Sequence, residues 1–310
     1  MKFDNKEDIL FLTQDWEGDR FEDGRPRVSD SLIERLRNVT TEEAAMALYS
    51  RGYTHQFEGA FKRTNDHYPL RRLIGRAVTA VMVPSRIDVH MHLLAEGREK
   101  NGRKGFFNQW VIETMGERDV LVVDMCDQIV YGTYVGGNLS TAIRARTKTG
   151  GAVIWGGIRD LEQIDRMDDF QLYYRGIDPT PIGDVMMTGM NVPARIGHAV
   201  CLPGDIVHGT ESGVTFIPAQ MAEYVASTAE KLHVRDIFGF ERLETGTYTP
   251  AQIDSAWTEE IMEDFLDWFE KSPKAEPYRA YGLDWSEEIE MGRNPEKRHT
   301  FNGIVTQKFG

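Results

Sequence analysis

The sequence predicts an α/β protein in which a central domain carries helical extensions at both ends. Two short, nearly continuous apolar runs, at residues 119–126 and 151–157, are typical of strands buried on both faces. Residues 138–146 lie between them and have apolar side chains at helical spacing. Strands that alternate with helices indicate an α/β domain. We place its boundaries as follows: a helical lead-in at 1–70, the α/β domain at 71–232, and a helical extension at 233–310.

Local patterns predict the other elements in chain order. Thr40 stands three residues before Glu43, which is the spacing of a capping box at the start of a helix. A β-branched run at 75–84 predicts a strand. Further strands are expected within 194–209, where the turn Pro203-Gly204-Asp205 breaks the run, and at 213–218.

The C-terminal part is predicted to be helical. Pro218 precedes a helix over 218–232, which we expect to run along the outside of the domain. Further on, large apolar residues share one helical stripe and cover either the chain's own core or a neighbouring subunit: Ile253, Trp257, Ile261, Phe265, Trp268 and Phe269.

Composition excludes several classes of function. A net charge of −13 argues against a nucleic-acid partner, because phosphate contacts need clustered Lys and Arg. The N-terminal stretch "MKFDNKEDILFLTQDW" lacks the apolar region of a secretory signal, and no apolar run approaches the roughly 18 residues of a membrane span. We therefore expect a cytoplasmic protein without a membrane partner. Cys126 and Cys201 form no disulfide or CxxC pattern, and their apolar neighbours predict buried thiols.

The stretch "GGAVIWGGIRDLEQI" (150–164) places an arginine and an aspartate directly after a predicted strand. Ligands of α/β sheets collect beyond the carboxyl ends of the strands, so Arg159 and Asp160 should lie at that edge. Gly156 and Gly157 would let the backbone turn sharply and approach a ligand. The structural alternative is that Asp160 merely caps the helix that "DLEQI" begins.

A second glycine turn lies upstream, in "YVGGNLSTAIRAR". Gly136 and Gly137 precede a helix, whose free backbone N–H groups can bind a small anion. Neither GxxxxGK[ST] nor GxGxxG is present, so a short carboxylate fits better than a nucleotide. The two turns together could hold a 2-oxo acid. Arg159 would bind the carboxylate of the 2-oxo acid through two hydrogen-bond donors, and Asp160 would ligate a hard divalent cation.

The chain resembles a known family at these motifs. "GGNLSTAIRAR…GGAVIWGGIRD", followed by "PGDIVHGTESGVTFIP", is similar to the RraA-like family over roughly residues 39–220. That family includes divalent-metal-dependent (class II) 4-hydroxy-4-methyl-2-oxoglutarate / 4-carboxy-4-hydroxy-2-oxoadipate aldolases and the regulator of ribonuclease activity A. The resemblance implies a β/β/α layered core related to the phosphohistidine swivelling domain, assembled as a homotrimer or homohexamer.

The resemblance also implies roles for individual residues. Arg159 would bind the pyruvate carboxylate and steady the enolate, and Asp160 would ligate Mg2+ or Mn2+. Backbone amides around the upstream turn would hold the pyruvyl unit, at Gly137, Asn138, Leu139 and Ser140. The cation would polarise the keto oxygen as the carbon–carbon bond breaks.

One departure concerns proton transfer. The family's aldolases usually carry an acid just after the glycine of the upstream turn, whereas this chain has Asn138, or Gly137 in a shifted alignment, and neither is a base. Decarboxylation or enolisation tolerates this loss better than a full retro-aldol reaction does. Asp124 and Asp127, at the end of a predicted strand, are candidates to replace the missing acid. The resemblance also implies that a carboxylate from the C-terminal helix of an adjacent subunit completes the site, and Asp236 and Glu241 are the candidates for it.

These observations predict a metal-dependent lyase, an aldolase or a decarboxylase, acting on a 2-oxo acid with further carboxylate or hydroxyl groups and releasing pyruvate or CO2. The alternative is a non-catalytic RraA-like regulator that binds a protein partner. A methyltransferase is not supported, because no SAM-type glycine loop follows the first strand. His90 and His92 in "DVHMH" would share a face if extended, but no third zinc ligand has suitable spacing.

Overall fold

The structure is a computed structural model that describes residues 3–65, 72–148 and 150–294. Among these residues, nine strands form one mixed sheet in the order β1-β11-β10-β3-β4-β5-β6-β2, with β7 paired to β3. The strands of this sheet are β1 (Phe57–Glu58), β2 (Lys62–Arg63), β3 (Leu73–Pro84), β4 (Asp119–Asp124), β5 (Gly151–Ile158), β6 (Gln171–Ile177), β7 (Val185–Met190), β10 (Ile206–Gly209) and β11 (Val214–Ile217). A separate hairpin consists of β8 (Ala194–Ile196) and β9 (Ala199–Cys201).

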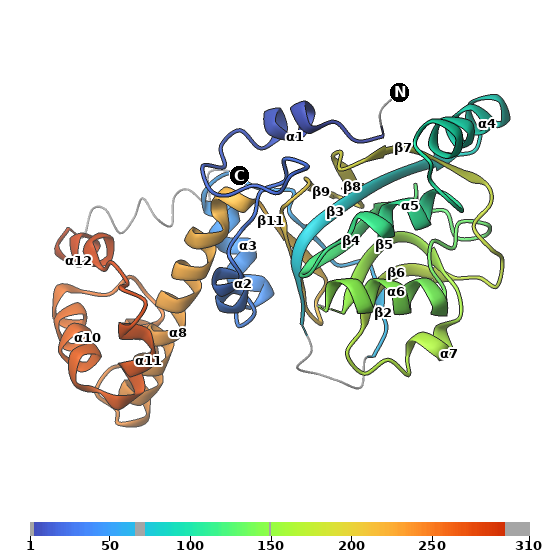
Figure 1. Cartoon of the computed structure of the whole chain (residues 1–310). Helices are drawn as coiled ribbons and strands as arrows, with labels where there is room; N and C mark the ends of the chain where they lie inside the picture. The colour runs from blue at the N-terminus through green and yellow to red at the C-terminus, as the bar shows by residue number, and fades with distance from the viewer. Residues whose placement is uncertain (1–2, 66–71, 149, 295–310) are drawn as a thin grey trace, which may run out of the picture.

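Helices cover this sheet and extend beyond it (Figure 1). The α-helices are α1 (Lys6–Leu12), α2 (Asp30–Leu36), α3 (Thr41–Ser50), α4 (Ile87–Ala95), α5 (Phe107–Thr114), α6 (Gly137–Thr147), α7 (Leu161–Ile164), α8 (Ala222–Glu244), α9 (Pro250–Ile253), α10 (Glu259–Lys271), α11 (Glu276–Arg279) and α12 (Ser286–Arg293). A π-helical turn, η1 (Glu96–Lys100), continues α4, and two 3-10 turns are η2 (Ala219–Met221) and η3 (Pro273–Ala275).

The middle of the sheet is parallel, and its edges are antiparallel. Strands β3, β4, β5 and β6 run parallel to one another. The long strand β3 pairs with β4 on one side and, on the other, with β10 near its start and β7 near its end. The carboxyl ends of β4 and β5 therefore meet at one edge of the sheet, which is where the predicted site residues lie.

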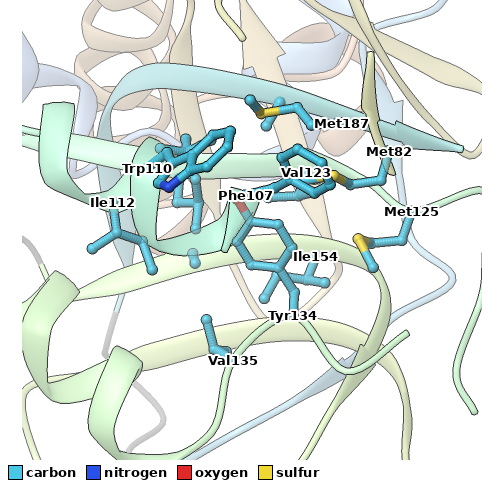
Figure 2. Close-up of a cluster of buried hydrophobic side chains, with 14 of the residues drawn as sticks. Met82, Phe107, Trp110, Ile112, Val123, Met125, Tyr134, Val135, Ile154 and Met187 are labelled. Atoms are coloured by element: carbon cyan, nitrogen blue, oxygen red, sulfur yellow. The ribbon is translucent and has the colours of Figure 1, made fainter. Parts of the chain in front are cut away.

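Both faces of the parallel strands are covered, which explains why their sequences are apolar without a gap. Val123 and Ile154 face the helical side, where they pack with Phe107 and Trp110 of α5 (Figure 2). The alternate residues face the other side, where the β8–β9 hairpin covers them in a second cluster that includes Val122, Val153, Ala194 and Ile196.

The N-terminal region contains the predicted helices and also two short strands. The capping box of Thr40 and Glu43 is confirmed at the start of α3. Helices α2, α3 and α8 pack over β10 and β11 around a third cluster, which includes Leu36, Leu48 and Ile217. Strands β1 and β2 join opposite edges of the sheet, so residues before position 71 also contribute to it.

The C-terminal helices have a hydrophobic cluster of their own. Trp257, Ile261, Phe265, Trp268 and Phe269 of the predicted stripe are buried around Phe238 of α8. Of the two alternatives left open by the sequence, the structure shows that the stripe packs against neighbouring helices of the same chain. Figure 1 shows α8 leading from the sheet to this group of helices, α10 to α12.

Several sequence expectations need correction. The "DVHMH" segment is the helix α4 rather than extended chain, and strands β6 and β7 were not predicted. Cys126 is exposed, although Cys201 is buried as expected. The mixed α/β class is confirmed, while the relation to the swivelling domain stays a prediction. Among the described residues, no helix is long and apolar enough to cross a membrane.

Candidate active site

The candidate site begins where β5 ends. The strand continues through Gly156 and Gly157 to Ile158, so the two glycines lie within it and form no turn, contrary to the sequence interpretation. A Cβ at Gly157 would lie 2.7 Å from the Ile129 carbonyl oxygen, and one at Gly156 would lie 2.5 Å from Cβ of Met125. The glycines are therefore needed because the loop after β4 packs closely against the end of β5.

That loop then runs beside the end of β5 like a short extra strand. Thr133 forms a parallel bridge with Gly157. The amide of Tyr134 donates to the Gly157 carbonyl at 2.9 Å, and the amide of Arg159 donates to the Val135 carbonyl at 3.0 Å. These backbone hydrogen bonds place Gly136, the next residue of the loop, directly beside Arg159 and Asp160.

Asp160 does not cap its own helix. It occupies the position before α7 with a left-handed backbone (φ 57°), and its side chain makes no capping hydrogen bond there. Instead, Oδ2 accepts a hydrogen bond from the backbone amide of Gly137 at 3.2 Å, across to the start of α6. The carboxylate thus joins the two turns, and among the described residues its Oδ1 has no hydrogen-bond partner.

Gly136 makes this approach possible. A Cβ on Gly136 would lie 2.3 Å from Oδ2 of Asp160 and 3.0 Å from Cγ and Nε of Arg159. The Arg159 side chain therefore lies across Gly136, with Nε 3.8 Å from Oδ2 of Asp160. The Arg159 and Asp160 side chains are 43% and 35% exposed. Within the described part of the chain, the two terminal guanidinium nitrogens of Arg159 have no partner. They are open to an anion from solvent.

The start of α6 leaves two amides free. The amide of Gly137 is taken by Asp160, and the amide of Ser140 donates to the Gly136 carbonyl at 3.0 Å. Among the predicted substrate-binding amides, only those of Asn138 and Leu139 therefore remain without a partner in the described part of the chain, since the first amides of a helix have no intrahelical partner. Asn138 is exposed, whereas Ser140 is buried and its hydroxyl has no hydrogen-bond partner among the described residues.

Asp124 and Asp127 have partners on other elements. Asp124 ends β4 and is 6% exposed; it accepts a hydrogen bond from the Cys126 amide and lies 3.8 Å from Nε of Arg195 on β8. Burial raises the pKa of the Asp124 carboxyl above its usual range. Asp127 pairs with Arg175 of β6 at 3.0 Å. These contacts do not connect either carboxylate to Arg159 or Asp160.

Asp236 and Glu241 lie on α8, and Figure 1 places α8 and α7 on opposite sides of the molecule. Glu241 accepts hydrogen bonds from Trp268 and Lys274 in the C-terminal helices. Burial and the charge of Glu43 raise the pKa of Asp236. Neither acid reaches the site of its own chain, so a role for them in a neighbouring subunit's site stays a prediction.

The arrangement suits a cation held by few protein ligands. No cluster of three His, Cys, Asp or Glu side chains able to hold a metal occurs among the described residues. His90 is buried in α4 against Ser85, whereas His92 is exposed, so they form no pair. Mg2+ commonly binds through one or two carboxylates, with water and substrate completing its shell. The exposed Asp160 carboxylate, with one oxygen unpaired, fits that mode.

Sequence reasoning missed Gln163, the first-turn residue of α7. Its amide lies over Gly137, because a Cβ on Gly137 would be 2.1 Å from Oε1 of Gln163. The available signal was spacing, because Gln163 follows Asp160 by three residues in the helix that the sequence predicts from Asp160 onwards. Nothing in the sequence, however, shows that this helix meets the start of α6.

Comparisons with known proteins agree with this fold. The sequence model described as "RraA-like: Aldolase/RraA" matches residues 27–216. "Protein DlpA" of Legionella pneumophila is 24% identical over 234 residues, which are 73% of this chain and 33% of that protein. "Putative 4-hydroxy-4-methyl-2-oxoglutarate aldolase" of Halalkalibacterium halodurans is 33% identical over 124 residues, 38% of this chain and 55% of that protein. The chain thus spans only part of both relatives.

Solved structures share the fold at lower identity. Streptomyces coelicolor RraAS2, described as an unusual member of the RNase ES inhibitor RraA protein family, superposes with a TM-score of 0.57 and 23% identity, covering 70% of this chain and 100% of that one. An uncharacterized protein from Pseudomonas syringae pv. tomato superposes with a TM-score of 0.56 and 20% identity, covering 74% of this chain and 98% of that one.

Proposed function

The chain belongs to the RraA-like family, and from this we propose that it is a divalent-metal-dependent lyase that cleaves a carbon–carbon bond of a 2-oxo acid. The relative named as a 4-hydroxy-4-methyl-2-oxoglutarate aldolase supports a lyase. The observation that supports this proposal most directly is the carboxylate of Asp160, which leaves its own helix uncapped and meets the start of α6 beside Arg159.

Each residue of the site has a distinct task in this proposal. The planar guanidinium of Arg159 would bind the substrate carboxylate through two parallel hydrogen bonds. The free amides of Asn138 and Leu139 would donate to the pyruvyl oxygens at the positive end of α6. Asp160 would ligate Mg2+ or Mn2+, which when bound would act as a Lewis acid at the keto oxygen.

Proton transfer would depend on solvent. Neither Asn138 nor Gly137 can accept a proton, and the described contacts bring no carboxylate other than Asp160 to Arg159. Decarboxylation needs no protein base, because the electron pair of the broken bond moves towards the keto group as CO2 leaves. The resulting carbanion then takes a proton from water. We further propose that the chain works as a homotrimer or homohexamer, in which a neighbour could add a carboxylate.

The decisive experiment is to measure pyruvate release from oxaloacetate and from 4-hydroxy-4-methyl-2-oxoglutarate, with Mg2+ and with EDTA. Asp160→Asn keeps an oxygen to accept the Gly137 hydrogen bond but removes the charge that a cation needs, so we expect turnover to fall at least about 100-fold. Asp168→Asn makes the same change at an exposed position of the same loop region and should retain activity.

The outcomes separate the possible functions. Metal-dependent turnover that Asp160→Asn abolishes would support the lyase, and the preferred substrate would distinguish aldolase from decarboxylase. Turnover that resists both EDTA and Asp160→Asn would refute the role of the cation. If wild type neither turned over these acids nor bound Mg2+, the lyase proposal would fail and a regulator would become the better hypothesis.

A further inference from the structure

The two glycines at the start of α6 each admit one polar side chain from the turn after β5. Gly136 leaves room for the Asp160 carboxylate, because a Cβ there would lie 2.3 Å from Oδ2. Gly137 leaves room for Gln163 in the same way, with Oε1 at 2.1 Å and Cδ at 3.2 Å from the Cβ position. The backbone amide of Gln163 also donates to the Asp160 carbonyl at 2.9 Å, so both side chains come from one tight turn.

The side-chain amide of Gln163 is not used by the described part of the protein. Its side chain is exposed, and among the described residues its amide group has no hydrogen-bond partner. The side chain lies over Gly137, since a Cβ on that residue would be within 3.4 Å of Cβ, Cδ and Oε1 of Gln163. A polar group that lies over Gly137, the residue before the free amides of Asn138 and Leu139, and that is unpaired among the described residues is available to a ligand.

We propose that Gln163 binds the distal half of the substrate, beyond the keto group, and so determines which 2-oxo acids the site accepts; this inference rests on the proposed function. A side-chain amide offers two donors and one acceptor, so it can pair with a distal carboxylate or hydroxyl group. It is neutral and cannot accept a proton, so its role is positioning and discrimination. The site then distinguishes pyruvate, which ends at the methyl group, from longer acids with a polar end.

Binding measurements test this without requiring turnover. The probes are pyruvate and 2-oxoglutarate, which carries a distal carboxylate, titrated calorimetrically in the presence of Mg2+. Gln163→Met keeps the length and removes the hydrogen bonds. We expect it to weaken 2-oxoglutarate binding about fivefold to tenfold, the worth of one net hydrogen bond, and to leave pyruvate binding within about twofold.

Two further variants sharpen the result. Gln163→Glu keeps the shape but places a negative charge near the distal carboxylate, so it should weaken 2-oxoglutarate binding more than Gln163→Met does. Gln14→Met makes the matched change at an exposed position after α1 and should alter neither affinity.

The inference about Gln163 and the proposed function fail in different ways. If Gln163→Met left both affinities unchanged, or weakened both ligands equally, Gln163 would have no role in specificity while the pyruvate site would stand. If wild type bound neither pyruvate nor 2-oxoglutarate with Mg2+, the proposed function would be refuted and the role of Gln163 with it.

Discussion

Replacing Gly136 by alanine tests the site with a single methyl group. Gly136 has an extended backbone (φ −129°, ψ −163°) that alanine adopts without strain, so the effect should be steric. The new Cβ would lie 2.3 Å from Oδ2 of Asp160, whereas ordinary contacts begin at 3.4 Å. The carboxylate must therefore move by about 1 Å, and a displacement of that size at a reacting centre costs on the order of 100-fold in rate.

We expect Gly136→Ala to fold normally, to lose about 100-fold in kcat/KM for pyruvate release, and to bind Mg2+ more weakly. Initial rates, Mg2+ titration calorimetry and the thermal midpoint measure the three quantities separately. Gly116→Ala is the matched control, because among the described residues its Cβ would meet only Oδ2 of Asp119 at 3.8 Å, an ordinary contact. A folded Gly136→Ala protein with wild-type rate and Mg2+ affinity would refute the argument that Asp160 acts from its present position.

Two further predictions concern binding and pH. Arg159→Lys keeps the positive charge but loses the two-donor fork, so the Kd for pyruvate should rise about tenfold in calorimetry while Mg2+ affinity changes little; an unchanged Kd would exclude a bidentate contact. Burial raises the pKa of Asp205 from its usual 3.8 to about 7. The folded state thus holds this proton more tightly than the unfolded chain. The resulting contribution to the free energy of unfolding is complete below about pH 4 and is lost as the pH rises through 7. Urea unfolding at several pH values should show that the free energy of unfolding of Asp205→Asn rises relative to that of wild type, by up to about 4 kcal/mol, as the pH rises. Parallel curves of unfolding free energy against pH would contradict this.

The elements around the site are predictable from sequence because they depend on local patterns. The apolar runs of β4 and β5 and the helical spacing of α6 lie within a few residues of the expected bounds. The contact between the glycine turn and Asp160 also follows from a simple rule, since neighbouring parallel strands end at one edge. Local pattern, strand direction and chain order are therefore sufficient to predict these elements and the proximity of the two turns.

The finer geometry depends on packing between distant segments. Gly156 and Gly157 look like a turn in the sequence, but the reason for them is the loop carrying Met125 and Ile129. Asp160 takes a left-handed backbone, and its carboxylate accepts a hydrogen bond at the start of α6 instead of capping α7. No local pattern predicts this, since an acid before a helix normally caps it. The position of Gln163 likewise depends on how α7 meets α6, which no pattern in either segment reveals.

The separate hydrophobic cluster of the C-terminal helices has an evolutionary consequence. Its buried members run from Val234 to Trp285 and include no residue of the sheet, while the family match ends at residue 216. A segment that buries its own apolar surface can be gained, lost or exchanged without opening the core beneath the candidate site. The RraA-like domain and the C-terminal helices therefore each keep a hydrophobic core of their own and are joined through the long helix α8.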